Sequence, residues 1–210
     1  MKPEYAKHLR GLYIVTPDWD DLSQLMAATE LALQNGAALV QYRHKTACVE
    51  QRRAQASALL ALCRQYDVPL IINDHVDLCL EIDADGIHVG GTDASIAEVR
   101  KAVGPDRIVG ASCYGTLELA HAAYRDGASY VAFGGFYPSR VKKYDFRTAP
   151  EIIAQSKREI PLPVVVIGGI TLENAPPLVA QGADMVAVIS SVYLVPVEER
   201  KTRQLADLYR

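Results

Sequence analysis

The chain has 210 residues, half of them hydrophobic and 22% charged, with a formal net charge of -3. This length is enough to bury one sizeable core, so we expect a single domain covering residues 1–210. The nearly balanced charge gives no general attraction to nucleic acid or to an acidic membrane surface, and neither is expected as a partner.

The cysteines and the N-terminal residues argue against export. The four cysteines are far apart in the sequence and form no C-x-x-C pair, which excludes a zinc knuckle and a disulfide framework. The N-terminus is charged and carries no apolar signal segment, and no run approaches the roughly 18 apolar residues of a membrane span. We expect reduced thiols and a cytoplasmic protein.

Short apolar runs alternate with helix-like segments along the whole chain. The runs lack a strict polar alternation, which is typical of strands buried on both faces, as in a parallel sheet. Strands are expected at residues 11–16, 38–41, 70–74, 86–89, 108–112, 130–133, 163–167 and 185–189. Helices are expected at residues 21–34, 49–66, 76–81, 95–103, 116–125, 151–158, 172–181 and 198–209. A long basic loop covers residues 134–148.

An internal repeat supports this count of strands. A turn of small residues followed by an apolar run recurs at residues 36–40, 83–87, 127–131 and 182–186. Each separation fits two strand–helix units. Eight such units favour an α/β protein with the closed (β/α)8 architecture of a TIM barrel, and an open doubly wound sheet is the alternative.

In a barrel, every strand ends at one mouth, where ligands bind. Gln41, Arg43 and Lys45 follow the second strand at alternate positions, so their side chains should project the same way. Arg43 can grip a phosphate with its planar fork and Lys45 adds a mobile charge, whereas Gln41 can hydrogen-bond a heterocycle. The alternative for this triplet is a solvated loop.

Two aspartates follow neighbouring strands of the predicted barrel. Asp74 and Asp93 come just after the third and fourth strands, and Asn73 and Ser112 stand at the ends of the third and fifth. Converging carboxylates suit Mg²⁺, which takes one or two carboxylates together with substrate phosphate oxygens. The alternatives are helix-cap or turn roles for Asn73, Asp74 and Asp93, and a plain turn hydroxyl for Ser112.

A second candidate anion site follows the last two strands. Gly168-Gly169 leads into a helix after the seventh strand, and Ile189-Ser190-Ser191 follows the eighth. In barrels these two loops often form a phosphate cradle, because glycines let backbone N–H groups approach the oxygens. The alternative is an ordinary strand-to-helix turn. Lys142 and Lys143 could close over another anion or remain solvated.

The histidines are not given a catalytic role. His88 lies within the fourth strand, where a core histidine with satisfied hydrogen bonds is the simpler interpretation. His44 and His75 lack the spacing of metal ligands.

Taken together, these motifs resemble those of the thiamine phosphate synthase family. The resemblance runs from the first strand to Ser191 and rests on residues 41–45, 72–74, 86–90 with Asp93, 134–139 with Lys142, and 167–170. It implies an enzyme that joins 4-amino-5-hydroxymethyl-2-methylpyrimidine diphosphate to a thiazole phosphate, giving thiamine phosphate and diphosphate. It implies small-molecule substrates and Mg²⁺, and it is compatible with a homo-oligomer.

The resemblance also implies residue roles. The pyrimidine diphosphate would contact Gln41, Tyr42, Arg43, His44, Lys45, Asn73, Ser112 and Lys142. The thiazole phosphate would contact Ser139, Arg140, Val141, Gly169, Ile189 and Ser190. Asp74 and Asp93 would hold Mg²⁺, and the departing diphosphate would be stabilised by Arg43, Lys45 and Lys142.

The sequence departs from the family pattern at two places. Val141 stands where many members have a threonine, and Gly91-Thr92 replaces a bulkier polar pair. The competing interpretations are a thiazole tautomerase of the same superfamily and a non-catalytic sensor of a phosphate ligand. Both would bind without the metal, so the aspartate pair beside the Gln-x-Arg-x-Lys set favours the synthase.

Overall fold

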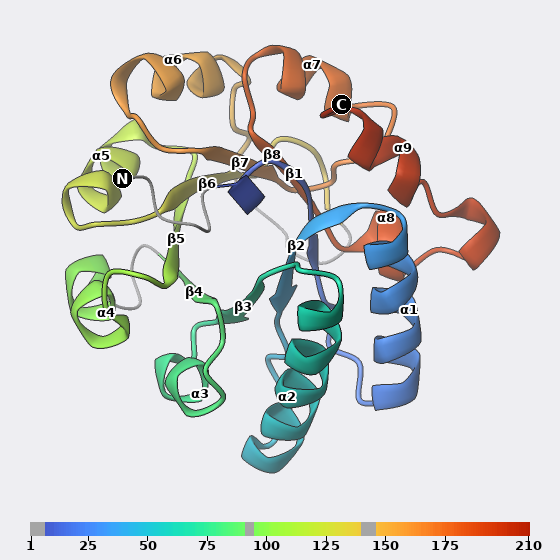
Figure 1. Cartoon of the computed structure of the whole chain (residues 1–210). Coiled ribbons are helices and arrows are strands. Elements are labelled where there is room, and N and C mark those ends of the chain that lie inside the picture. The colour runs from blue at the N-terminus through green and yellow to red at the C-terminus, as the bar shows by residue number, and fades with distance from the viewer. Residues whose placement is uncertain (1–6, 91–94, 140–145) are drawn as a thin grey trace.

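The computed structural model of the chain describes residues 7–90, 95–139 and 146–210. Eight parallel strands form a closed barrel in which each strand pairs with the next in sequence and the last pairs with the first (Figure 1). The strands are β1 (Gly11–Val15), β2 (Ala37–Tyr42), β3 (Leu70–Asn73), β4 (Gly86–Gly90), β5 (Ile108–Tyr114), β6 (Tyr130–Gly134), β7 (Val164–Ile167) and β8 (Met185–Val188). The (β/α)8 prediction is confirmed, and the open doubly wound sheet is excluded.

The helices form a ring outside the strands (Figure 1). They are α1 (Leu22–Gln34), α2 (Val49–Gln65), α3 (Val76–Glu81), α4 (Ile96–Val103), α5 (Leu117–Arg125), α6 (Glu151–Glu159), α7 (Ala175–Ala180), α8 (Ser190–Tyr193) and α9 (Thr202–Asp207), with a 3-10 helix η2 (Val197–Glu199).

The C-terminal third departs from the expected helix bounds. The helix predicted at 172–181 begins only at Ala175, because the Asn174 side chain accepts the Thr171 N–H (2.8 Å) and closes a turn there. The helix predicted at 198–209 is divided into η2 and α9, since Arg200 adopts an extended conformation. The short helix α8 was not predicted.

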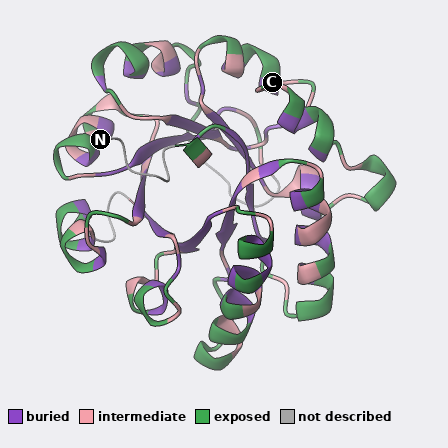
Figure 2. Ribbon diagram, viewed as in Figure 1, coloured by how far each residue is buried: buried purple, intermediate pink, exposed green. Residues whose placement is uncertain are grey.

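Strand alternation creates two apolar layers, one inside the barrel and one between barrel and helices. In β1, Tyr13 and Val15 belong to the inner cluster, whereas Leu12 and Ile14 pack toward the helices. Figure 2 shows the strands buried and the helices buried mainly on their barrel-facing sides. Both strand faces are therefore covered, which explains why the strands read as continuous apolar runs.

Local signals in the sequence explain the first helix. Asp21 caps α1 by accepting the Gln24 N–H at 3.0 Å. Gly36, with φ +93°, ends the helix and begins the turn into β2. The observed helix, Leu22–Gln34, agrees with the predicted range of 21–34 to within one residue.

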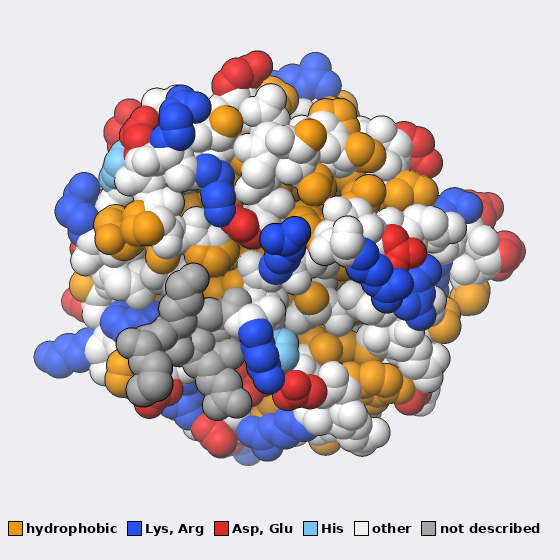
Figure 3. All heavy atoms as spheres, turned by 45° about the horizontal axis from the view of Figure 1, so that its top comes forward, with side chains coloured by type: hydrophobic (Ala, Val, Ile, Leu, Met, Phe, Trp, Pro, Cys, Tyr) orange, Lys and Arg blue, Asp and Glu red, His pale blue; other side chains and the backbone are white. Residues whose placement is uncertain are grey.

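The surface shows no dominant sign of charge on the face drawn in Figure 3, where basic and acidic side chains are interspersed. Across residues 7–90, 95–139 and 146–210, no helix is both long enough and apolar enough to cross a membrane.

Candidate active site

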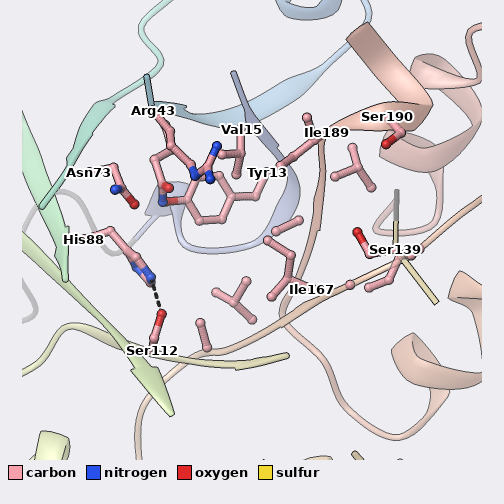
Figure 4. Close-up of a pocket in the computed structure, with 18 of the residues that line it drawn as sticks. Tyr13, Val15, Arg43, Asn73, His88, Ser112, Ser139, Ile167, Ile189 and Ser190 are labelled. Atoms are coloured by element: carbon pink, nitrogen blue, oxygen red, sulfur yellow. Dashed lines mark hydrogen bonds between the residues drawn. The ribbon is translucent and has the colours of Figure 1, made fainter. Parts of the chain in front are cut away.

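A cavity of about 340 Å³ opens at the carboxyl ends of the strands, and each of the eight strands contributes to its lining (Figure 4). This is the mouth to which the sequence assigned the candidate residues. Arg43 and Asn73 lie at one side of the cavity in Figure 4, and Ser139 and Ser190 lie at the other.

Alternate residues at the end of β2 and just after it lie on opposite sides of the chain, one side facing the cavity. Gln41, Arg43 and Lys45 line the cavity, as expected. The structure places Tyr42 and His44 outside it: the Tyr42 hydroxyl donates to Gln55 on α2 (2.8 Å), and His44 Nε2 pairs with Asp20 at 3.2 Å. Alternate residues of an extended segment face opposite sides, which explains why these two side chains lie outside the cavity. Their contact with a bound substrate stays a prediction.

The end of β1 holds Arg43 in place. The Arg43 N–H donates to the Thr16 hydroxyl at 2.8 Å, and the hydroxyl in turn donates to the Arg43 carbonyl at 3.0 Å. The guanidinium of Arg43 lies 3.3 Å from the Asp18 carboxylate, which also accepts the Lys45 N–H at 2.8 Å. Neither Thr16 nor Asp18 was among the predicted site residues, although Thr16 ends the expected first strand and Asp18 follows it closely.

Asn73 and Asp74 line the cavity at the end of β3. Asp74 adopts a left-handed backbone conformation (φ +63°), its N–H donates to the His88 carbonyl at 2.9 Å, and its carboxylate accepts the Asn73 amide at 2.7 Å. This exposed carboxylate faces the same cavity as Arg43 and Lys45, a donor set that fits Mg²⁺ shared with a phosphate.

The second proposed metal ligand, Asp93, lies outside the described residues. Among the residues that are described, no group of three or more His, Cys, Asp or Glu side chains is arranged to hold a metal ion.

A chain of polar side chains forms the floor of the cavity. The Tyr13 hydroxyl lies 2.6 Å from Gln41 Nε2 and 2.8 Å from the Tyr130 hydroxyl, which lies 2.9 Å from His88 Nδ1. His88 Nε2 lies 2.9 Å from the Ser112 hydroxyl, the contact drawn in Figure 4. Burial raises the pKa of both tyrosines, so they remain protonated at neutral pH.

The glycine pair after β7 and the start of α8 lie on the cavity wall. Gly168 and Gly169 both have positive φ, +111° and +62°, and a Cβ on Gly169 would overlap the Pro138 carbonyl. Among the described residues, the N–H groups of Gly169 and Ser190 have no hydrogen-bond partner. Free backbone N–H groups beside a short helix provide the donors that an anion requires.

The remaining predicted residues divide into two groups. Ser139 and Ile189 line the cavity. The loop residues Arg140, Val141, Lys142 and Lys143, and also Gly91 and Thr92, lie outside the described part of the chain.

His88 lines the cavity but was not among the predicted site residues. It is buried and bonded through both ring nitrogens, as expected for a core histidine, but it also lines the cavity. The pairing of β3 with β4 would have indicated its position, because it places His88 in register with Asn73, which was a predicted site residue.

Comparison with known proteins relates the whole barrel to one family. The family model described as thiamine monophosphate synthase matches residues 12–192. A thiamine-phosphate synthase of Janthinobacterium sp. (strain Marseille) is 61% identical over 202 residues, covering 96% of this chain and 98% of that protein. Another, of Thiobacillus denitrificans, is 49% identical over 95% of this chain and 94% of its own length. A solved thiamine phosphate pyrophosphorylase from Pyrococcus furiosus superposes with a TM-score of 0.84 at 31% identity, covering 97% of this chain and 96% of its own.

Proposed function

Since the chain belongs to the thiamine monophosphate synthase family and is therefore a transferase, we propose that it joins 4-amino-5-hydroxymethyl-2-methylpyrimidine diphosphate to a thiazole phosphate. The products are thiamine phosphate and diphosphate. One observation supports this assignment most directly: the same cavity has cationic side chains at one side and, at the other, backbone N–H groups that have no partner among the described residues. Two anionic substrates could therefore lie head to head above the polar floor.

Arg43 and Lys45 are proposed to bind the diphosphate. The Arg43 fork can make paired hydrogen bonds to phosphate oxygens, and the more exposed Lys45 can follow the charge as it moves. Asp18 and Thr16 hold Arg43 in position before substrate arrives. Lys142 is proposed as a third cation, on the basis of the family motif.

The proposed reaction breaks the bond between the pyrimidine methylene carbon and the diphosphate oxygen. The bonding electron pair leaves with diphosphate, and the thiazole nitrogen then supplies the pair that forms the new C–N bond. The chain stabilises the departing negative charge through Arg43 and Lys45 and holds the two rings in line. No nucleophile from the protein is needed.

Asp74, with Asp93, is proposed to hold Mg²⁺. When bound, the ion supplies positive charge beside the diphosphate oxygens. The accessible Asp74 carboxylate at the cavity edge supports this part of the proposal.

Gly169 and Ser190 are proposed to bind the phosphate of the thiazole substrate through their backbone N–H groups. Ser139 and Ile189 would lie against the same substrate, since both line this side of the cavity. Arg140 and Val141 are proposed as further contacts from the family motif.

The test is diphosphate release by the purified protein with both substrates, with each alone, and with excess chelator. The proposal expects release only with both substrates and Mg²⁺, and thiamine phosphate in equal amount. Isomerisation of the thiazole phosphate alone would instead indicate a tautomerase, and binding without any product would indicate a sensor.

A further inference from the structure

We propose that the hydrogen-bond chain under the cavity runs in one fixed direction, which makes the Ser112 hydroxyl a donor and the Gln41 side-chain oxygen an acceptor toward the bound heterocycle. Tyr13, Tyr130 and His88 are then positioning residues. They act through Gln41 and Ser112, and they set the hydrogen-bonding pattern of the ligand that the floor accepts.

The direction follows from counting protons along the chain. Gln41 Nε2 can only donate, so Tyr13 accepts from it and must pass its own proton to Tyr130. The Tyr130 proton then goes to His88 Nδ1. A proton on His88 Nδ1, as in an imidazolium, would reverse this last bond, and the Tyr130 proton would then face two donors, the Tyr13 hydroxyl and the His88 N–H.

His88 is therefore the neutral tautomer with its proton on Nε2. That proton is donated to the Ser112 oxygen at 2.9 Å, which leaves the Ser112 proton for a ligand in the cavity. Burial keeps both phenols protonated, as the raised pKa values of Tyr13 and Tyr130 require. Within these bonds, Tyr13, Tyr130 and His88 each donate once and accept once.

The contact between His88 and Tyr130 is built into the barrel by a glycine. His88 on β4 and Tyr130 on β6 are separated by β5, where Gly110 is in register with both. A Cβ on Gly110 would lie 2.6 Å from His88 Nδ1 and would overlap the end of the Tyr130 ring. The two rings stack with centroids 5.7 Å apart and planes at 17°. Only glycine leaves room for this bridge across the intervening strand.

The fixed direction selects among heterocycles. A floor that offers a donor from Ser112 and an acceptor from Gln41 matches an edge with a ring nitrogen acceptor beside an exocyclic amino donor. A 4-oxo pyrimidine presents the reverse pattern, a ring N–H beside a carbonyl. Its ring N–H would face the donor Ser112, and its carbonyl would face the acceptor oxygen of Gln41. This identification of the ligand edge rests on the proposed function, whereas the direction of the chain does not.

The direction can be measured without any ligand, by ¹⁵N NMR of protein labelled at histidine, at neutral pH. The His88 signals are identified by their loss in His88→Gln. We expect the wild-type spectrum to show a neutral His88 ring with its proton on Nε2. A proton on Nδ1, or on both nitrogens, would overturn the proposal whatever the enzyme does.

Variants then test the positioning role of Tyr130. Tyr130→Phe removes the donor to Nδ1 and should give a mixture of the two His88 tautomers. The control is Tyr193→Phe, which removes another buried phenol that pairs with Thr29 instead, and it should leave the His88 signals unchanged. A His88 spectrum of wild-type form in Tyr130→Phe would refute the role.

A turnover assay links the chain to the substrate. The ratio of kcat/KM for the 4-amino substrate to that for its 4-oxo analogue should fall about tenfold in Tyr130→Phe and stay unchanged in Tyr193→Phe. An unaltered ratio in Tyr130→Phe contradicts the positioning role. Failure of the proposed function would appear differently, as absence of turnover in the wild type with an intact His88 spectrum.

Discussion

The Thr16 hydroxyl holds both polar groups of Arg43's backbone, accepting its N–H at 2.8 Å and donating to its carbonyl at 3.0 Å. Thr16 is fully buried just after β1, and Arg43 lies just after β2. The cation proposed to bind diphosphate is thus fixed by the neighbouring strand and not by its own loop alone. This explains how a residue outside any regular element can be held in place.

Replacing Thr16 by valine keeps the shape of the side chain and removes both hydrogen bonds. Because the Arg43 N–H and carbonyl then lose their partner, we expect a loss of about 1–3 kcal/mol in the free energy of unfolding in urea. The KM for the pyrimidine diphosphate should also rise. Thr29→Val is the control, since Thr29 is equally buried and bonded to the Leu25 carbonyl on α1. If both variants change KM alike, Thr16 has no special part in binding.

Gly169 is expected to tolerate no side chain. Alanine at Gly169 would have to adopt a positive φ, and its Cβ would overlap the Pro138 carbonyl. Alanine at Gly104 would also have to adopt a positive φ, but no atom lies within 4 Å of its Cβ. Gly104→Ala should cost about 1–3 kcal/mol in the free energy of unfolding and leave the KM for thiazole phosphate unchanged. Gly169→Ala should also raise that KM at least tenfold. Steady-state kinetics with varied thiazole phosphate decides, and equal KM values in the two variants would contradict the proposed cradle.

The barrel and the location of its site could be predicted because they follow from local patterns. Alternation places Gln41, Arg43 and Lys45 on one side, and the same rule, applied strictly, places Tyr42 and His44 on the other. The motif resemblance assigned all five residues to the substrate, and for Tyr42 and His44 that assignment stays a prediction.

The floor of the cavity could not be predicted from the sequence. His88 bonds to Tyr130, 42 residues away and two strands across, through space that Gly110 leaves open. An apolar run such as β4 gives no sign of which members face inward until the register with its neighbours is known. The prediction of one continuous helix at 198–209 was wrong for a similar reason. Helix propensity does not reveal that Arg200 adopts an extended conformation.

Asp74→Asn tests the proposed metal site while preserving the backbone, since asparagine accepts the left-handed conformation found there (φ +63°). We expect the thermal midpoint to change little and turnover to fall at least a hundredfold, with excess Mg²⁺ restoring part of it. The control is Asp67→Asn, which also has positive φ (+51°) but lies in an exposed ion pair with Lys7 away from the cavity. Near-normal turnover in Asp74→Asn would remove this residue from the metal site.

Three buried thiols predict how the stability of the fold depends on pH. Burial raises the pKa of Cys63 and Cys113 to about 12 and that of Cys79 to about 11. Because an unfolded thiol ionises near pH 9, the folded state binds more protons above that pH. The stabilisation from these thiols is therefore complete below about pH 8 and is lost as the pH rises through 9 to 12.

Urea unfolding between pH 8 and 10 should show this loss, and Cys63→Ala should make the free energy of unfolding fall less steeply with pH. The buried tyrosines add to the decline only at higher pH, since an unfolded phenol ionises near pH 10.

In the native protein at pH 8, alkylation should reach the exposed Cys48 quickly and the other three cysteines only through unfolding. Rapid labelling of any thiol in Cys48→Ser protein would show that the layer between barrel and helices opens far more readily than its burial implies.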